Sequence, residues 1–233
     1  MDVGVIGRSF GVTELCAKHK PGKGTYDVKK NELKPWQVKS WVIPAASAEF
    51  VCQMEEILDV YERPYDPQFP VVCLDESPKQ LISEAQKGFV DSKGVQHFDY
   101  EYKRAGVTDI FMVVEPLGAT RKVFIMDSHD SHQWAAVVAY IVENMYPQAI
   151  KISLVQDNLS AHRKAALYEV FDPQRARSIL KKLEFVWTPK HGSWLNIAEC
   201  ELSILTKQGL QSRIASKDEL EKQASLWADT RNN

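Results

Sequence analysis

The spacing of apolar residues in the first half of the chain predicts one helix and then a short strand. Apolar positions recur at helical spacing over residues 46–62, and this pattern ends before Pro64. An apolar run at 71–74 then predicts a buried strand that stops at the two acids and the Ser-Pro pair after it. Residues 83–96 are polar and are expected to form a loop.

Three further strands and a helix are predicted in the middle of the chain. Aromatic and charged residues alternate over 98–104, which is typical of a half-buried strand. Residues 109–127 contain two apolar runs around a glycine turn, which predicts a pair of strands. Residues 130–146 have amphipathic helical spacing, with Asp130 or Ser131 as the N-cap.

Strands and helices alternate in the last third of the chain. An apolar strand at 152–156 is followed by an acid, and a helix is expected from about Ser160. The remaining predicted elements are a helix at 175–183, a strand at 184–189, and helices at 194–211 and 217–231. This order predicts an α/β fold in which helices flank a sheet.

The composition is that of an ordinary globular protein, with 44% hydrophobic and 26% charged residues. No run approaches the ~18 apolar residues of a membrane helix, and the N-terminus lacks the pattern of a signal peptide. The four cysteines form no C-x-x-C pair, so neither a zinc site nor a disulfide framework is indicated. We therefore expect a cytoplasmic protein with no membrane partner.

The net charge of −2 is unusual for a nucleic-acid-binding protein, which commonly carries a basic surface. Two regions are nevertheless basic. Residues 1–41 carry eight Lys and Arg against four acids, and residues 163–213 carry nine against five. These charges are compatible with a surface that follows phosphates, and equally with ordinary solvated faces.

Three acids stand where a metal site could form. Asp75 and Asp157 each end a predicted strand, and Glu199 lies near the start of a predicted helix. Carboxylates suit hard ions such as Mg²⁺, and two such ions can activate a water and stabilise a leaving oxygen at phosphorus. Taken singly, an aspartate at a strand end is more commonly a turn former or a helix cap. The spacing of the three acids alone does not decide between these interpretations.

The sequence around all three acids resembles the catalytic blocks of DDE-type transposases, most closely the mariner-related bacterial insertion-sequence family. The resembling segments are VVCLDESPKQLI, LVQDNLSAH and TPKHGSWLNIAECEL. The resemblance implies a ribonuclease-H-like mixed sheet flanked by helices. It also implies DNA strand cleavage and strand transfer with two Mg²⁺ or Mn²⁺ ions, and double-stranded DNA and a homodimer as partners. It assigns the catalytic and metal-binding roles to Asp75, Asp157 and Glu199.

Other residues in these blocks are candidates for positioning the carboxylates or contacting DNA. His162 is expected either to face DNA or a metal-bound water, or to pack locally, and Trp194 either touches DNA or belongs to the core. Asn196 lies three residues before Glu199 and is expected to share its helix face and orient it. The full set is Asn158, His162, Lys190, His191, Trp194 and Asn196.

Three neighbouring residues are not expected to be ligands. Glu76 follows Asp75 on a strand and should point to the opposite face of the sheet. His129 and His132 resemble a metal pair but open a helix outside the three blocks, so a metal role is not expected for them either.

The predicted organisation is a remnant of a DNA-binding region at 1–40, a helical linker at 41–68 and a catalytic domain at 69–233. Complete members of the resembled family begin with helix-turn-helix units, which the first residues here do not resemble. We therefore expect a truncated copy. The alternatives to an active transposase core are an inactive remnant that at most binds DNA or transposase, and a ribonuclease-H-like nuclease with another substrate.

Overall fold

The computed structural model describes residues 47–86, 88–97 and 100–233, which belong to one compact unit. The predicted remnant at 1–40 and the first part of the predicted linker lie outside the described residues. Within the described part of the chain, no helix is long and apolar enough to cross a membrane.

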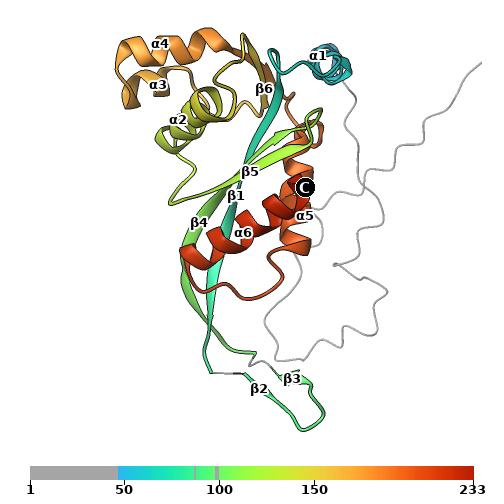
Figure 1. Cartoon of the computed structure of the whole chain (residues 1–233), viewed down its shortest axis with the longest axis vertical. Helices are drawn as coiled ribbons and strands as arrows, with labels where there is room; N and C mark the ends of the chain where they lie inside the picture. The colour runs from blue at the N-terminus through green and yellow to red at the C-terminus, as the bar shows by residue number, and fades with distance from the viewer. Residues whose placement is uncertain (1–46, 87, 98–99) are drawn as a thin grey trace, which may run out of the picture. The chain divides into compact units, whose positions relative to one another are not determined.

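A five-stranded mixed sheet forms the centre of this unit (Figure 1). The strand order is β5-β4-β1-β6-β7. β1 pairs antiparallel with β4 and parallel with β6, β4 pairs antiparallel with β5, and β6 pairs parallel with β7. The strands are β1 (Val71–Glu84), β4 (Tyr102–Glu115), β5 (Thr120–Met126), β6 (Ile152–Gln156) and β7 (Leu183–Trp187).

Helices cover both faces of the sheet, because successive side chains of the central strands point to opposite sides. Val72 and Leu74 of β1 pack in one hydrophobic cluster, whereas Val71 and Cys73 pack in the other. The first face, called the α2 face here, is covered by α2 (Ser131–Tyr140), the π-helical η3 (Ile141–Met145), α3 (Ala165–Val170) and α4 (Pro173–Lys182). The second, the α5 face, is covered by α1 (Ala48–Glu62), α5 (Ile197–Gln208) and α6 (Lys217–Asn232). The predicted α/β architecture of a mixed sheet flanked by helices is confirmed.

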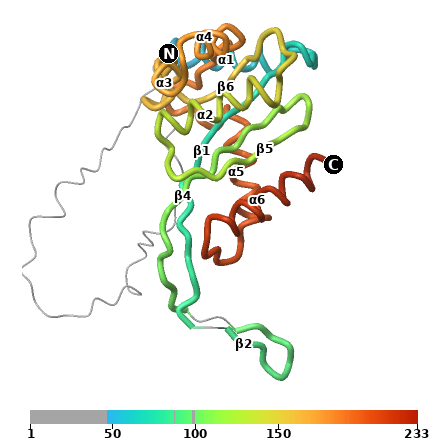
Figure 2. The backbone as a smooth tube through the Cα atoms, turned by 60° about the vertical axis from the view of Figure 1, so that its left-hand side comes forward, coloured from blue at the N-terminus to red at the C-terminus, as the bar shows by residue number. Residues whose placement is uncertain are grey.

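The first core strand is much longer than predicted. β1 runs through Pro78 to Glu84, and β4 begins at Tyr102, so the expected loop at 83–96 was wrong at its start. β6 pairs with β1 only as far as Cys73, so beyond that residue β1 is bordered by β4 alone, and an edge of this kind tolerates a proline. Figure 2 shows this pair of strands extending from the sheet to a small hairpin of β2 (Phe89–Val90) and β3 (Gln96–His97).

Most predicted helices are present, with shifted ends. Asp130 is the N-cap of α2 and accepts hydrogen bonds from the backbone N–H groups of His132 and Gln133. The helix expected from Ser160 begins only at Ala165, because the intervening residues form a turn. The helix expected over 194–211 is divided into a 3₁₀ turn, η4 (Ser193–Leu195), and α5.

Candidate functional site

Asp75 and Asp157 lie at the same level of two adjacent strands. Cys73 of β1 is paired in register with Val155 of the parallel strand β6. Asp75 lies two residues after Cys73, within β1, and Asp157 lies two residues after Val155, directly after the end of β6. Two residues is one full period of a strand, so Asp75 points to the same side as Cys73, the α5 face. The sheet therefore brings together two acids that are far apart in the sequence.

The N-terminus of α5 is fixed beside Asp75 by a buried asparagine. The Asn196 side chain accepts a hydrogen bond from the backbone N–H of Ala198 (3.1 Å) and donates one to the carbonyl of Leu74 (2.9 Å). Asn196 is thus the N-cap of α5 rather than a residue within it, which corrects the expectation of a shared helix face. Glu199 lies in the first turn of this helix. The hydrogen bond from Asn196 to Leu74, the residue before Asp75, therefore fixes the backbone of Glu199 near Asp75.

Burial and neighbouring acids disfavour the ionisation of Asp75. Its pKa is raised to about 7, first by burial and then by the negative charges of Glu76, Asp157 and Glu199; a hydrogen bond from the Glu76 N–H opposes the shift. Interactions of this kind require short separations. Asp75 is therefore a partly buried carboxylate with other acids near it, and a nearby cation would favour its charged form.

Two adjoining cavities are lined by the three candidate acids. Asp75 and Glu199 line one of about 430 Å³, together with Ser203 and Lys207 of α5. Asp157 lines another of about 590 Å³, together with Asn158, Lys190 and His191. Ser193 lines both, so the cavity of Asp157 adjoins the cavity of Asp75 and Glu199 at this residue.

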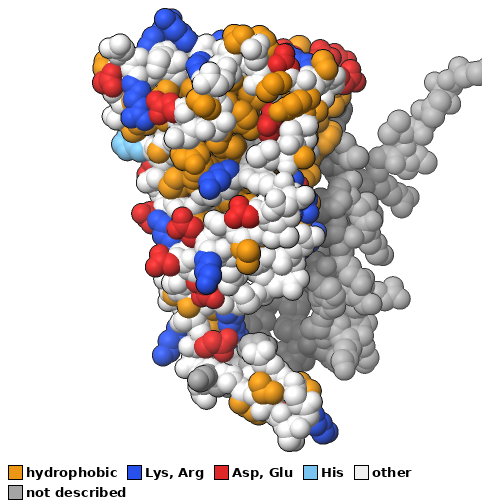
Figure 3. Space-filling view, viewed as in Figure 1, with side chains coloured by type: hydrophobic (Ala, Val, Ile, Leu, Met, Phe, Trp, Pro, Cys, Tyr) orange, Lys and Arg blue, Asp and Glu red, His pale blue; other side chains and the backbone are white. Residues whose placement is uncertain are grey.

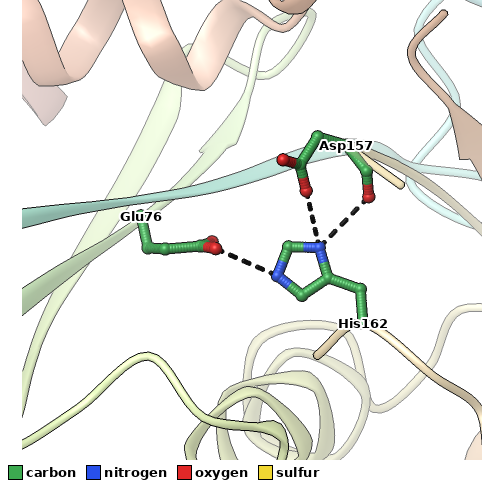
Figure 4. A group of neighbouring side chains, drawn as sticks. All are labelled: Glu76, Asp157 and His162. Atoms are coloured by element: carbon green, nitrogen blue, oxygen red, sulfur yellow. Dashed lines mark hydrogen bonds and ion pairs between the residues drawn. The ribbon is translucent and has the colours of Figure 1, made fainter. Parts of the chain in front are cut away.

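His162 lies between Asp157 and Glu76 on the other side of the sheet (Figure 4). Its Nδ1 atom is 2.8 Å from Asp157 Oδ1, and its Nε2 atom is 3.2 Å from Glu76 Oε1. Burial lowers the pKa of His162, but the hydrogen bonds to Asp157 and Glu76 outweigh it and raise the pKa to about 10. In the described part of the chain these three residues form the group whose ligand-type atoms all lie within 4.8 Å.

The sequence over residues 70–221 matches the family model of the DDE superfamily endonucleases. The chain belongs to this family. A search of curated proteins gave no significant match.

Solved structures of Mos1 mariner transposase share the fold of this DDE protein. The Mos1 paired-end complex with Mn has 15% sequence identity and a TM-score of 0.54, and the match covers 83% of this chain and 59% of the Mos1 chain. The Mos1 strand transfer complex has 13% sequence identity and a TM-score of 0.56, and the match covers 83% of this chain and 58% of the Mos1 chain. The chain thus spans about three fifths of the length of these transposases. The likeness confirms the predicted ribonuclease-H-like fold.

The chemistry of the three candidate acids fits a hard divalent cation. All three acids offer oxygen ligands, as Mg²⁺ and Mn²⁺ prefer. A nearby positive charge would favour the charged form of Asp75, whose pKa is raised by burial and by neighbouring acids. Asp75, Asp157 and Glu199 do not, however, form a group within 4.8 Å in the described structure.

The remaining candidate residues divide into cavity-lining and outlying positions. Lys190 and His191 line the larger cavity on a tight turn, in which His191 has a φ of 67°. Trp194 is 60% exposed, so it does not belong to the hydrophobic core. His129 pairs with Asp109 (3.0 Å), and His132 lies 3.7 Å from Glu169; these two histidines do not share a partner.

Glu76 is the residue whose role the sequence did not indicate. Strand alternation predicted that it points away from Asp75, and its side chain does lie on the α2 face beside His162. Its partner could not be inferred, because this requires knowing that the turn after β6 folds back toward β1. A histidine five residues after Asp157 was the one local signal.

Replacing Asn196 by alanine is expected to weaken both the fold and the site. The substitution removes the cap of α5 and leaves the Leu74 carbonyl without its buried donor. We expect a loss of about 2 kcal/mol in the free energy of unfolding. Urea denaturation measures this loss. Asn196→Asp keeps the cap acceptor but loses the amide donor and should fall between the two; equal stability of wild type and Asn196→Ala would contradict the assignment.

Proposed function

We propose that this chain uses Asp75, Asp157 and Glu199 to bind divalent cations, Mg²⁺ or Mn²⁺, and thereby cleaves and transfers DNA strands. The observation that carries the proposal is the register of β1 and β6, which brings Asp75 and Asp157 to corresponding positions of adjacent strands. The negative charge of Glu199 also contributes to the raised pKa of Asp75. Membership of the DDE endonuclease superfamily gives this arrangement its chemical meaning.

The chain's own residues supply position and charge rather than a covalent nucleophile. Two bound ions would supply an activated water or hydroxyl and a stabilised leaving oxygen at phosphorus. Asp75 must be deprotonated to act as a ligand, and with a pKa of about 7 it is only partly so at neutral pH. Asn196 holds the first turn of α5 so that Glu199 faces the same region.

Double-stranded DNA is the proposed substrate, with the protein acting as a homodimer. The Mos1 structures with the same fold are paired-end, pre-cleavage and strand transfer complexes, and one contains Mn. The proposed DNA contacts are Asn158, Lys190 and His191, which line the larger cavity with Asp157, and the exposed Trp194. Lysine binds phosphates, and an exposed indole stacks on bases.

Cleavage of supercoiled plasmid and of linear duplex DNA tests the proposal. Purified full-length protein should nick DNA with Mn²⁺, weaker activity is expected with Mg²⁺, and EDTA should abolish it. Asp157→Asn, purified in parallel, excludes a contaminating nuclease. Equal nicking by both proteins would refute the assignment of the triad, and a preference for RNA–DNA hybrids would favour a different nuclease. A folded protein that binds DNA without cleaving it would favour the inactive remnant.

A further inference from the structure

On the α2 face, His162 contacts Asp157 and is itself contacted by Glu76 and Trp134. We propose that His162 is a positioning residue that holds the Asp157 carboxylate in the orientation needed to bind the metal ion. This inference rests on the function proposed above and assigns to His162 and Glu76 a part in it. The two side chains would touch neither DNA nor the ion.

His162 contacts both the main chain and the side chain of Asp157. Its Nδ1 atom lies 3.1 Å from the Asp157 carbonyl oxygen and 2.8 Å from Oδ1. A carbonyl oxygen can only accept, so Nδ1 carries a hydrogen and donates it. Within the described residues, this carboxylate makes its contacts through Oδ1, including a weak one from the Leu159 N–H (3.4 Å). Because these contacts fix Oδ1, they also fix the direction of the other oxygen, Oδ2, which is available to a cation.

The imidazole itself is held from three sides. Glu76 Oε1 lies 3.2 Å from Nε2, and the Trp134 ring stacks on the imidazole at 5.7 Å between centroids and 23° between planes. Trp134 also donates from Nε1 to the side chain of Gln156, the residue before Asp157 (3.0 Å). The His162 side chain is 1% exposed. The ring therefore has little freedom to turn, and the orientation that it imposes on Asp157 is correspondingly fixed.

The same three residues could be taken for a metal site of their own, but the geometry favours support. Figure 4 shows the ring lying between the two carboxylates, with one nitrogen turned to each. A metal ion can take a lone pair from only one of these nitrogens, and Nδ1 already carries a hydrogen. Residues that hold a metal-binding side chain from behind typically change metal affinity or activity by about 10–100-fold when removed.

Two amide substitutions separate the two nitrogens of His162. In His162→Asn the amide nitrogen stands near the position of Nδ1 and can still donate to Asp157. In His162→Gln it stands near the position of Nε2 and can reach only Glu76. His132→Gln is the matched control, because His132 is a largely exposed histidine on α2 whose partner is Glu169. Thermal unfolding of each variant shows whether it is folded.

Mn²⁺ titrations of the full-length proteins by calorimetry, and of their plasmid nicking rates, decide the proposal. We expect His162→Gln to raise the half-saturating Mn²⁺ concentration by about 10–100-fold, with nicking recovered at excess Mn²⁺. His162→Asn should stay within about threefold of wild type, and His132→Gln should match it. Folded His162→Gln with wild-type Mn²⁺ binding would overturn the positioning role while leaving the proposed function intact.

Two further outcomes keep the test decisive. If His162→Gln does not fold, the titration of His162→Asn decides instead: a folded His162→Asn whose half-saturating Mn²⁺ concentration rises by about tenfold or more counts against the proposal, because it keeps the donor to Asp157. If wild type itself binds no Mn²⁺ and cleaves no DNA, the proposed function fails, and the role of His162 fails with it.

Discussion

Asp75→Asn is expected to abolish metal-dependent cleavage and, at the same time, to stabilise the metal-free protein at pH 8. The loss of activity follows from removing a carboxylate that holds the cations, and should be about 10³-fold or more. The gain in stability follows from the raised pKa of Asp75: in the folded protein its negative charge is buried beside Glu76, Asp157 and Glu199. An uncharged side chain of the same size removes that repulsion.

The raised pKa of Asp75 makes the metal-free protein less stable as the pH rises. The pKa of Asp75 is 3.8 in the reference state and about 7 in the folded protein. Between these values the folded state binds more protons than the unfolded state, so the stability attributable to Asp75 is present below about pH 4 and is lost as the pH rises to 7. The loss is at most about 4 kcal/mol for a fully buried group, and less here because Asp75 is only partly buried.

Thermal unfolding in EDTA at pH 5 and pH 8 measures this effect. The stabilisation by Asp75→Asn should be larger at pH 8, whereas Asp59→Asn, at an exposed position on α1, should change neither value. Added Mn²⁺ should raise the unfolding midpoint of wild type and leave that of Asp75→Asn almost unchanged. Lower stability of the metal-free Asp75→Asn protein at pH 8 would contradict the repulsion inferred for the three acids.

Patterns over a few residues were enough to predict the core strands. The apolar runs at 71–74 and 152–156 and the short run before Pro189 all form strands of the central sheet. The extension of β1 beyond Asp75 could not be predicted in this way. It depends on pairing with β4, some 30 residues later in the chain, and this pairing overrides the local signal of Pro78.

The three candidate acids were chosen from their sequence context, whereas the relative position of the two aspartates depends on strand register. The number of residues between Asp75 and Asp157 does not indicate whether they lie side by side in the sheet. The parallel pairing of Cys73 with Val155 determines this. Asn196 shows the same limit. Its spacing from Glu199 predicted a shared helix face, but the helix begins after it, because its side chain caps α5 and reaches the Leu74 carbonyl.

The two glutamates of α5 provide the second large effect, because Glu201 should matter for stability and Glu199 for activity. Glu201 is buried between two arginines: Oε2 lies 3.2 Å from Arg121 Nε, and Oε1 lies 3.1 Å from Arg231 Nη2. Arg121, on β5, is 8% exposed in its side chain and also donates to Asn232 at the end of α6 (3.1 Å). Glu201 therefore joins α5, β5 and α6.

Glu201→Gln is expected to lower the free energy of unfolding by about 3–5 kcal/mol, because it leaves the buried Arg121 charge without its counter-ion. For a domain of this size the midpoint of thermal unfolding should fall by roughly 10 °C. Nicking at low temperature, where the variant is folded, should remain close to wild type.

Glu199→Gln, the same substitution two residues earlier on the helix, should show the reverse pattern. It should lose nicking at every temperature and unfold no earlier than wild type, since Glu199 repels Asp75 in the metal-free protein. Circular dichroism melting curves and plasmid nicking of the two variants give both readouts. A Glu201→Gln protein that melts like wild type would show that the ion-pair network contributes little. A stable Glu201→Gln protein without activity would instead show that Glu201 serves the catalytic site, directly or through the position of α5, rather than stability.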